Sequence, residues 1–433
     1  MGAMTSWLSR ALVASALLGP AVAAAQPQPA PAVSASTDAG TARLPVLTPT
    51  DRVALAPLLA QGPVAFVEFT DGEELPAVLL AVTVHAPAAT IAHVIADPAG
   101  YPRFMASLDT VHVTSRTGQV VAYEWTWRAA MFELHGTNQM TAYAPPARNA
   151  AAGHRIAIRA VSGDLGTGRF LWRVIPQGPS SSLVTLSVRL DTRQGSYVAR
   201  QLSAGARSIN RSINIALALE MLLSSRREAE HRAAPPTAQR APSPGPAATM
   251  TAAALHRPDF PMDALAPMLA RGDLVVLHMQ GDRLSQVTVM GRMGKSRDET
   301  RAIMTDPTAF GSALMPGSHV DAAGRDEQGA LFDWTVSLPL IGSSGRMRLV
   351  AEPAQISLDA LSGNLVPGHW RFETPEYSWG EAAVVGWGHF DPATASWLLR
   401  GVVEGDRDFG HGIEAASLLM VVRAIRSRLW PEQ

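Results

Sequence analysis

The side chains of this sequence that could do chemistry form two rows of aromatic and apolar residues with few polar groups among them. Tyr123, Trp125 and Trp127 lie two residues apart on one predicted strand, so they share a face of it. One face of the next predicted strand has Asn138 as its only polar residue and carries Phe132, Leu134, Asn138 and Met140. Rows of this kind predict either a filled core or one wall of a cavity for an apolar ligand.

Most motifs of enzymes and metal proteins are missing from the sequence. It contains no Gly-x-Ser-x-Gly and no His-Glu-x-x-His, and none of its twelve histidines is spaced from another as a metal pair on one helical turn. The absence of cysteine excludes thiolate nucleophiles, thiolate metal sites and disulfides. Gly294-Lys295-Ser296 looks like part of a phosphate loop, but Val289 stands where the first glycine is required. We therefore expect neither a metal nor a cofactor, and no motif identifies a catalytic residue.

A long helix must hold the remaining candidates, because the apolar period becomes 3.6 residues after Asp191 and stays so to about Leu223. Its apolar stripe consists of Leu202, Ala206, Ile209, Ile213 and Ala216. Glu220 falls within the stripe, either as a pocket carboxylate or at a frayed, exposed helix end. Gly205 lies at its edge, where its cost in a helix indicates a close neighbour. The candidate ligand contacts on this helix are Gly205, Ile209, Ile213 and Glu220.

Much of the sequence occurs twice. Leu55-Ala-Pro-Leu-Leu-Ala-Gln-Gly62 returns as Leu265-Ala-Pro-Met-Leu-Ala-Arg-Gly272, and Tyr123-Glu-Trp125 returns as Phe332-Asp-Trp334. Near the end of the chain the separation settles at 200 residues, as between Ser162-Gly-Asp-Leu165 and Ser362-Gly-Asn-Leu365. The ligand candidates in the second copy are Phe332, Trp334 and Phe409. We expect two domains, at 47–232 and 258–433, joined by a linker rich in proline and alanine at 233–257.

The N-terminal residues indicate export. Residues 1–25 have a charged start, a short apolar run and small residues at Ala23-Ala24-Ala25, and residues 26–46 read as an unstructured spacer. No later segment is apolar for long enough to span a bilayer. The net charge is −1 and the charges are mixed along the chain, so no basic stripe for nucleic acid or acidic lipid is visible. We expect a periplasmic or extracellular protein that binds no nucleic acid and has no stable membrane span after signal removal.

The elements of the first copy follow from their periods and breaks. Two strands are predicted at 64–69 and 78–84, followed by a helix over 87–95 that ends before Pro98. A meander of strands is then predicted at 110–114, 120–128, 132–143, 154–161, 168–175 and 183–190, and the long helix follows. This order predicts an α+β fold of two tandem units, each with a curved antiparallel sheet around a long C-terminal helix.

Two stretches of the first copy make the resemblance to a family specific. Val82-Thr-Val-His-Ala-Pro87 and Asp97-Pro-Ala-Gly-Tyr-Pro-Arg-Phe-Met105, with the amphipathic terminal helix, resemble the START and polyketide-cyclase superfamily, including coenzyme Q-binding proteins. The resemblance implies the helix-grip fold. The second copy departs from the pattern, with Gly294-Lys-Ser-Arg297 and Thr308-Ala-Phe-Gly311 at the corresponding places.

The resemblance and the aromatic rows together predict a non-catalytic carrier of an apolar small molecule, such as a lipid, a quinone or a polyketide-like compound. Two alternatives stay open. Relatives of this fold act as aromatases or cyclases, for which Tyr123, Asn138 and Glu220 would be the candidates; filled cores would instead indicate a structural module of the cell envelope. Because Asn138 and Glu220 have no clear counterpart in the second copy, the first copy is the better candidate if only one binds.

Overall fold

The chain has an α+β fold built on one large antiparallel sheet with several helices. The computed structural model describes residues 44–69, 77–129, 132–164, 166–191, 207–235, 251–314, 317–338, 341–378, 380–394 and 400–430, except 402 and 404. The described residues form one compact unit. The expected export signal at 1–25, nearly all of the spacer at 26–46 and most of the linker at 233–257 lie outside the described residues. So do Gly205 and the side chains of Phe132, Ile209 and Ile213.

The first repeat confirms the predicted meander of strands and adds a helix before it. Its elements are α1 (Pro49–Leu59), β1 (Val64–Glu68), β2 (Val78–Val84), α2 (Ala88–Ala96), η2 (Pro98–Arg103), β3 (Leu108–Thr117), β4 (Val120–Ala129), β5 (Phe132–Tyr143), η3 (Ala150–Ala152), β6 (His154–Gly163), β7 (Thr167–Gly178), β8 (Ser181–Asp191) and α4 (Arg207–Ala233). The unpredicted helix α1 begins at a capping box between Thr48 and Asp51, a signal that the sequence already contained.

The second repeat has elements in a closely similar order. They are η6 (Ala252–Ala254), α5 (Met262–Leu269), β9 (Gly272–Gln280), β10 (Arg283–Arg292), α6 (Arg297–Met304), α7 (Pro307–Leu314), β11 (Ser318–Arg325), β12 (Ala330–Leu338), β13 (Ile341–Ala351), β14 (Ile356–Gly363), β15 (His369–Glu373), β16 (Glu376–Ser378), β17 (Glu381–His389), η7 (Pro392–Thr394) and α9 (Arg407–Leu429).

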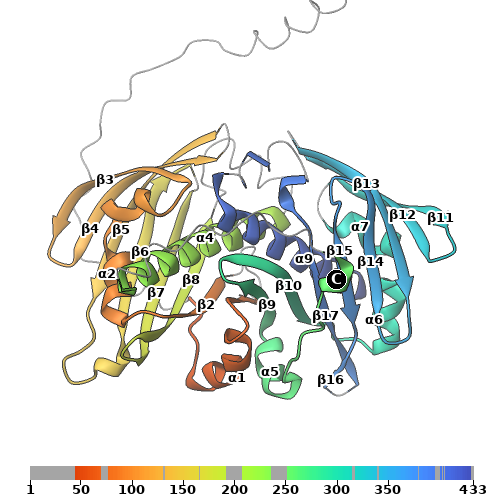
Figure 1. Cartoon of the computed structure of the whole chain (residues 1–433), viewed down its shortest axis with the longest axis horizontal. Helices are drawn as coiled ribbons and strands as arrows, with labels where there is room; N and C mark the ends of the chain where they lie inside the picture. The colour runs from red at the N-terminus through yellow and green to blue at the C-terminus, as the bar shows by residue number, and fades with distance from the viewer. Residues whose placement is uncertain are drawn as a thin grey trace, which may run out of the picture. The chain divides into compact units, whose positions relative to one another are not determined.

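Strand pairing repeats the duplication (Figure 1). The first repeat pairs its strands in the order β1-β2-β8-β7-β6-β5-β4-β3, and the second pairs them in the equivalent order β9-β10-β17-β15-β14-β13-β12-β11. The two halves meet where β1 pairs with β9, antiparallel. There Ala65 lies opposite Val275, which is 210 residues further on and is its own repeat counterpart. A local twofold axis therefore passes between these two residues.

Gly62 and Gly272, which end the first repeated motif, both lie at this junction. A Cβ on Gly62 would lie 2.0 Å from the carbonyl oxygen of Leu277, and a Cβ on Gly272 would lie 2.5 Å from that of Val67. Leu277 and Val67 are themselves counterparts at a separation of 210 residues. The motif therefore ends in glycine in both repeats because each glycine lets the other repeat's strand approach.

The rest of the repeated motif forms a helical layer on one face of the joined sheet. Leu55 and Leu58 of α1 and Leu265 and Leu269 of α5 are fully buried there, in a cluster with Trp387. Helices α1 and α5 also contact each other. Leucines at this spacing share one side of a helix, so the motif records the part of α1 and α5 that faces the sheet.

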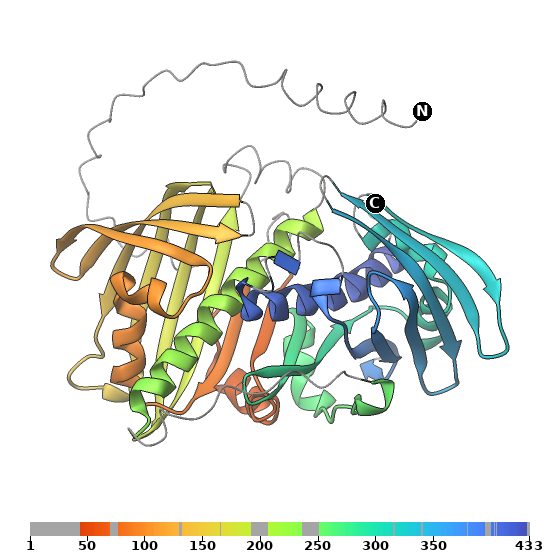
Figure 2. The ribbon, with the colours of Figure 1, turned by 45° about the horizontal axis from the view of Figure 1, so that its top comes forward.

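The long helices α4 and α9 pack against each other (Figure 2). Gly412 makes this possible, because a Cβ there would lie 2.3 Å from the Cα of Ala216 on α4. The expected close approach at the glycine pair 205 and 405 is wrong for Gly405, whose Cβ would meet nothing within 4 Å. Helix α4 also continues past the predicted end at Leu223 to Ala233.

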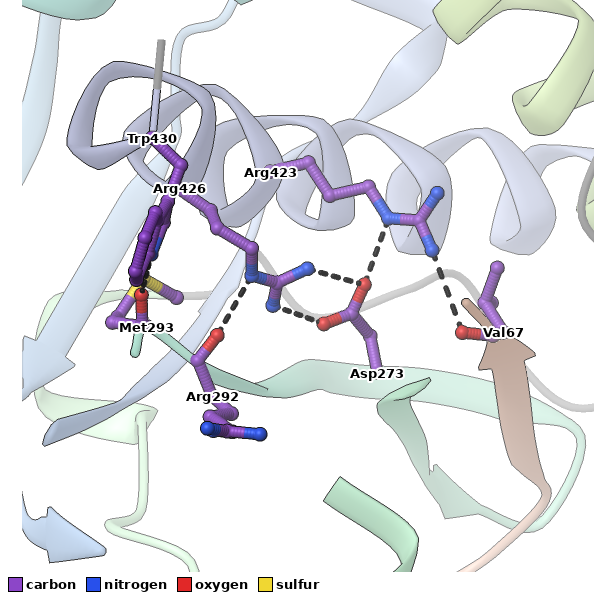
Figure 3. A network of polar contacts seen from close by, with 7 residues as sticks. All are labelled: Val67, Asp273, Arg292, Met293, Arg423, Arg426 and Trp430. Carbon is purple, nitrogen blue, oxygen red and sulfur yellow. Dashed lines mark hydrogen bonds and ion pairs between the residues drawn. The ribbon is translucent and has the colours of Figure 1, made fainter. Parts of the chain in front are cut away.

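A buried ion cluster fastens the end of α9 to the sheet (Figure 3). Asp273 of β9 is fully buried, and its Oδ2 accepts from Arg423 Nε at 2.8 Å while both its oxygens accept from Arg426. Arg426 Nε donates to the carbonyl oxygen of Arg292 at 2.7 Å, and Arg423 donates to that of Val67 in the first repeat. The cluster therefore links α9 to strands of both repeats.

Candidate functional site

The second repeat contains a cavity of about 420 Å³. Strands β11 to β15 and helices α6, α7 and α9 supply most of its lining, and Ala216 of α4 adds a contact from the first repeat. All three residues predicted for the second copy, Phe332, Trp334 and Phe409, line it. The structure therefore brings the second-copy candidates together around one space.

Sequence reasoning missed much of this lining, although the signal was present. On β13, Arg346 and Arg348 alternate with Met347 and Leu349, and only the two apolar residues line the cavity. On β15, Trp370 and Phe372 alternate with polar residues in the same way. Alternation with a period of two identifies the inward face of each strand. It cannot show that the faces of five strands surround an open space.

The described lining of the cavity carries no Asp, Glu, Lys or Arg. Two of its hydroxyls already donate to backbone carbonyls: Ser318 Oγ to Gly311 at 2.6 Å and Ser417 Oγ to Ile413 at 2.8 Å. His319 also contributes to the lining, but its side chain is 67% exposed and pairs with Asp321. A charged group placed inside would lose its hydration without gaining a partner, so the cavity suits a neutral, apolar molecule.

The aromatic residue at the centre of the predicted row has the same packing in both repeats. Trp334 lies opposite Gly345 on the neighbouring strand, and Trp125 lies opposite Gly136. A Cβ on Gly345 would come within 3.0 Å of the Trp334 ring, and one on Gly136 would come within 2.3 Å of the Trp125 ring. Each glycine therefore leaves room for an indole to lie flat across the adjacent strand.

Most first-copy candidates belong to the hydrophobic core. Tyr123, Trp125, Trp127 and Met140 are all at most 9% exposed and lie in one cluster, against which the partly buried Leu134 packs.

A polar pair lies within this core. Asn138 Nδ2 donates to the hydroxyl oxygen of Tyr123 at 3.1 Å, so these two candidates are brought together. Burial is the main reason that the pKa of Tyr123 is raised above its ordinary value, which keeps its hydroxyl protonated.

Glu220 lies in the middle of α4, at the contact with the second repeat. It is 3% exposed, so its interpretation as a frayed, exposed helix end is wrong. Asp406 and Asp408 at the start of α9 are its acidic neighbours. Ser107 Oγ donates to Asp406 Oδ2 at 2.8 Å, and Arg227 Nη1 donates to Asp408 Oδ1 at 2.7 Å. Glu220 therefore belongs to a buried polar network that joins the repeats.

The network also touches the aromatic candidates. The rings of Trp127 in the first repeat and Phe409 in the second have centroids 5.6 Å apart. Phe409 follows Asp408 directly and also lines the cavity. The contact between the repeats thus reaches the cavity wall at Phe409 as well as at Ala216.

Replacing Glu220 with glutamine is expected to stabilise the protein at pH 8 by about 1–3 kcal/mol. Burial, and then the charges of Asp406 and Asp408, raise the pKa of Glu220 well above its ordinary value. Because the pKa of Glu220 is higher in the folded than in the unfolded protein, the stability falls as the pH rises from the unfolded-state pKa towards the folded-state pKa. Glu220→Gln removes this fall in stability. Urea unfolding at pH 5 and pH 8 measures this pH dependence of the free energy of unfolding. The exposed Glu376→Gln is the control, and an equal pH dependence in wild type and Glu220→Gln would contradict the prediction.

The three residues suggested for a cyclase do not share the described cavity. Tyr123 and Asn138 bond to each other, whereas the acidic neighbours of Glu220 are those of α9, and none of the three lines the second-repeat cavity. Among the described residues, no group of three His, Asp or Glu side chains is arranged to hold a metal ion. The described helices include none long and apolar enough to cross a membrane.

Comparison with known proteins places the first repeat. Residues 77–213 match the family described as polyketide cyclase/dehydrase and lipid transport. No curated protein matches the chain.

Several solved structures resemble parts of the chain. The aromatase/cyclase Zhui from Streptomyces is 22% identical over 36% of this chain and 95% of its own, with a TM-score of 0.31. The di-domain aromatase/cyclase StfQ of the steffimycin pathway is 12% identical over 81% of this chain and 97% of its own, with a TM-score of 0.27. A STAR-related lipid transfer protein from Xanthomonas axonopodis is 14% identical over 40% of this chain and 93% of its own, with a TM-score of 0.31.

The family match covers the two stretches on which the resemblance rested, from the end of β2 through α2 and η2. It ends within α4, the helix that the apolar stripe predicted. Residues 77–213 therefore match the polyketide-cyclase part of the resemblance that the sequence implied.

Proposed function

We propose that this chain is a carrier or binding protein for one neutral, apolar small molecule, which it holds in the cavity of the second repeat. A lipid, a quinone or a polyketide-like compound fits this description. The observation that carries the proposal is the cavity of about 420 Å³ with no charged side chain in its described lining. This volume lies in the range of roughly 300–1,000 Å³ that is usual for small-molecule sites.

The proposal includes the finer architecture expected from the sequence. Each repeat would be a helix-grip domain, at 47–232 and 258–433, and residues 1–25 would direct export. The packing of α4 on β2 and β8, and of α9 on the equivalent β10 and β17, supports a sheet that holds its own terminal helix in each repeat.

Our proposal locates the ligand in the second repeat, whereas the sequence favoured the first. That preference rested on Asn138 and Glu220. In the structure Asn138 donates a hydrogen bond to Tyr123, and Glu220 lies beside α9. In this chain, the polar residues without a counterpart in the other copy take part in internal contacts. The cavity wall is instead made mostly of apolar residues.

Mass spectrometry of an organic extract of the purified full-length protein tests the function directly. We expect one apolar compound near a one-to-one ratio. Repeated extracts without such a compound, together with no saturable uptake of a fluorescent fatty alcohol or a quinone, would refute the proposal.

A variant that fills the cavity makes the test specific. Ala416 is 2% exposed on α9 and lines the cavity, so Ala416→Phe places a ring in the space that the ligand would occupy. We expect ligand recovery and probe affinity to fall at least about tenfold, which corresponds to roughly 1.4 kcal/mol. The matched control is Ala302→Phe, at an exposed position of α6 that is outside the lining. Equal recovery from both variants would show that the ligand binds elsewhere.

A further inference from the structure

A second pocket, of about 940 Å³, lies where the two repeats meet beside α1. Helix α1, the ends of β2 and β7, and α4 contribute to its lining, and Met279 and Gly281 add contacts from the second repeat. Val53 of α1 belongs to the lining and is 76% exposed, so the pocket opens to solvent. The pocket is separate from the second-repeat cavity, because the two share no lining residue. We call it the α1 pocket.

The described lining of the α1 pocket carries positive charge. Arg52 of α1 and Arg226 of α4 belong to it together with His85, and this lining contains no Asp or Glu. Arg52 is partly buried and makes no hydrogen bond or ion pair among the described residues. Its neighbour Asp51 already pairs with Arg271 at 2.6 Å. A guanidinium withdrawn from water without a partner costs free energy, which an anion in the pocket would offset.

The second repeat covers the equivalent surface with one of its own side chains. Tyr377 stands 200 residues after Gln177, and its hydroxyl donates to the carbonyl oxygen of Ala266 on α5 at 2.6 Å. Ala56 is the counterpart of Ala266 on α1, and it is exposed in the pocket, as is Gln177. The fold therefore does not require an open surface here.

The second repeat also supplies the anion that the first one lacks. Arg426, the counterpart of Arg226, bonds to the buried Asp273. At a separation of 210 residues, the first repeat has Pro63 in the place of Asp273. Arg226 instead pairs with Glu230 of its own helix, its Nε at 3.1 Å from Glu230 Oε1. A buried carboxylate between strand and helix is thus missing in the first repeat.

Arg52 has an apolar residue as its counterpart. The second repeat has Met262 at this place, and Met262 packs against the hydrophobic cluster of α1 and α5. An arginine is therefore not needed for the packing of this helix. The first repeat combines an additional cation, one fewer buried anion and an uncovered surface, which together indicate a site for an anionic ligand.

Apolar side chains in the lining determine the rest of the ligand. Leu59, Val82 and Leu183 line the α1 pocket and are at most 8% exposed. An inorganic anion would use only the polar part of this lining. A ligand with an apolar body can also cover the apolar part, as in most small-molecule sites, which combine apolar walls with a few polar groups.

We propose that the α1 pocket binds an amphiphilic organic anion, in which a carboxylate or a phosphate group is attached to an apolar chain. The anionic group pairs with Arg52, and Arg226 adds to the attraction. The chain lies against Val82 and Leu183. This ligand is distinct from the neutral molecule of the second-repeat cavity, and its binding does not depend on what fills that cavity.

Isothermal titration calorimetry of the full-length protein tests the site. Octanoate and octyl phosphate carry both the charge and the chain, whereas octanamide lacks the charge and inorganic phosphate lacks the chain. The Ala416→Phe variant is titrated as well as wild type, so that the second-repeat cavity does not contribute. We expect at least one alkyl anion to bind one-to-one to both proteins. In Ala416→Phe it should bind at least about tenfold more tightly than octanamide, because hydrogen bonds to charged groups are the stronger ones.

Two variants give the first repeat the residues of the second. Arg52→Met removes the cation, and Gln177→Tyr provides a ring that can cover Ala56 as Tyr377 covers Ala266. Each should weaken binding of the alkyl anion at least about tenfold. The matched controls are Arg116→Met and Gln119→Tyr, at exposed positions of β3 and the following turn that are outside the lining, and both should bind as wild type does.

Several results would overturn the proposal. They are the absence of binding by both alkyl anions, inorganic phosphate binding as tightly as octyl phosphate, octanamide binding to Ala416→Phe as tightly as the anions, and wild-type affinity in both Arg52→Met and Gln177→Tyr. Loss of anion binding in Ala416→Phe would place the anion in the second-repeat cavity and would also overturn it. Extraction of the neutral ligand from Arg52→Met should be unchanged, which separates this test from that of the carrier function.

Discussion

Replacing Asp273 with asparagine is expected to lower the free energy of unfolding by about 3–5 kcal/mol, because it leaves two arginines buried without their anion. Arg423 and Arg426 are 15% and 18% exposed, and the carboxylate between them is fully buried. Urea unfolding followed by tryptophan fluorescence measures the loss. The control is Asp321→Asn, whose carboxylate is 68% exposed and should matter by less than about 1 kcal/mol.

The pKa of the same carboxylate predicts that the protein loses stability in acid. Burial alone would raise the pKa of Asp273, but the charges and hydrogen bonds of Arg426 and Arg423 outweigh it and lower the pKa. A lowered pKa means that the stabilisation is complete above the ordinary value and is lost as the pH falls through the folded value. Wild type should therefore lose more stability than Asp273→Asn below about pH 4. Parallel stability curves for the two proteins would contradict this account.

Gly62→Ala is expected to cost about 3 kcal/mol and to loosen the pairing of β1 with β9. The new Cβ would lie 2.0 Å from the carbonyl oxygen of Leu277, a backbone atom that cannot move aside by changing a rotamer. The amide of Leu277 donates to the carbonyl of Pro63 at 2.9 Å, so its hydrogen exchange should accelerate. Hydrogen exchange with mass spectrometry reads this out together with the midpoint of unfolding.

A variant at a second glycine distinguishes the effect of the steric clash from the cost of a positive-φ backbone conformation. Gly281 also has a positive φ, of 63°, but a Cβ there would meet nothing within 4 Å. Gly281→Ala should therefore cost only about 1 kcal/mol and leave the exchange of Leu277 unchanged. Gly272→Ala, at the symmetric position, should behave like Gly62→Ala. Equal effects of Gly62→Ala and Gly281→Ala would show that the junction tolerates a side chain.

Much of the fold could be predicted because its signals are local. Strands β2 and β4 to β8 lie where alternation and turn residues predicted them, and α2 ends at Ala96, just before Asp97-Pro98. The repeat was also visible in the sequence, since each copy needs a glycine, Gly62 or Gly272, where the strand of the other copy approaches. Helix α1 was missed although Thr48 and Asp51 form its capping box.

The candidate site was less predictable, because burial depends on partners that are distant in sequence. Glu220 is covered by α9, whose Asp406 is 186 residues away, and no local pattern on α4 shows this. Phe332 and Trp334 were identified from alternation and repeat matching. Phe310 and Phe390 line the same cavity, but Phe310 lies on α7 and Phe390 directly follows β17, so neither belongs to the predicted aromatic row.

Sequence by itself determined the duplication, the α+β class, most strand positions and the family resemblance of the first repeat, because each rests on spacing within a short stretch of chain. Tertiary structure decided where the described cavity of the second repeat lies and which side chains line it. A cavity is the space left between the faces of many elements that are distant in sequence, so spacing within a short stretch of chain cannot reveal it.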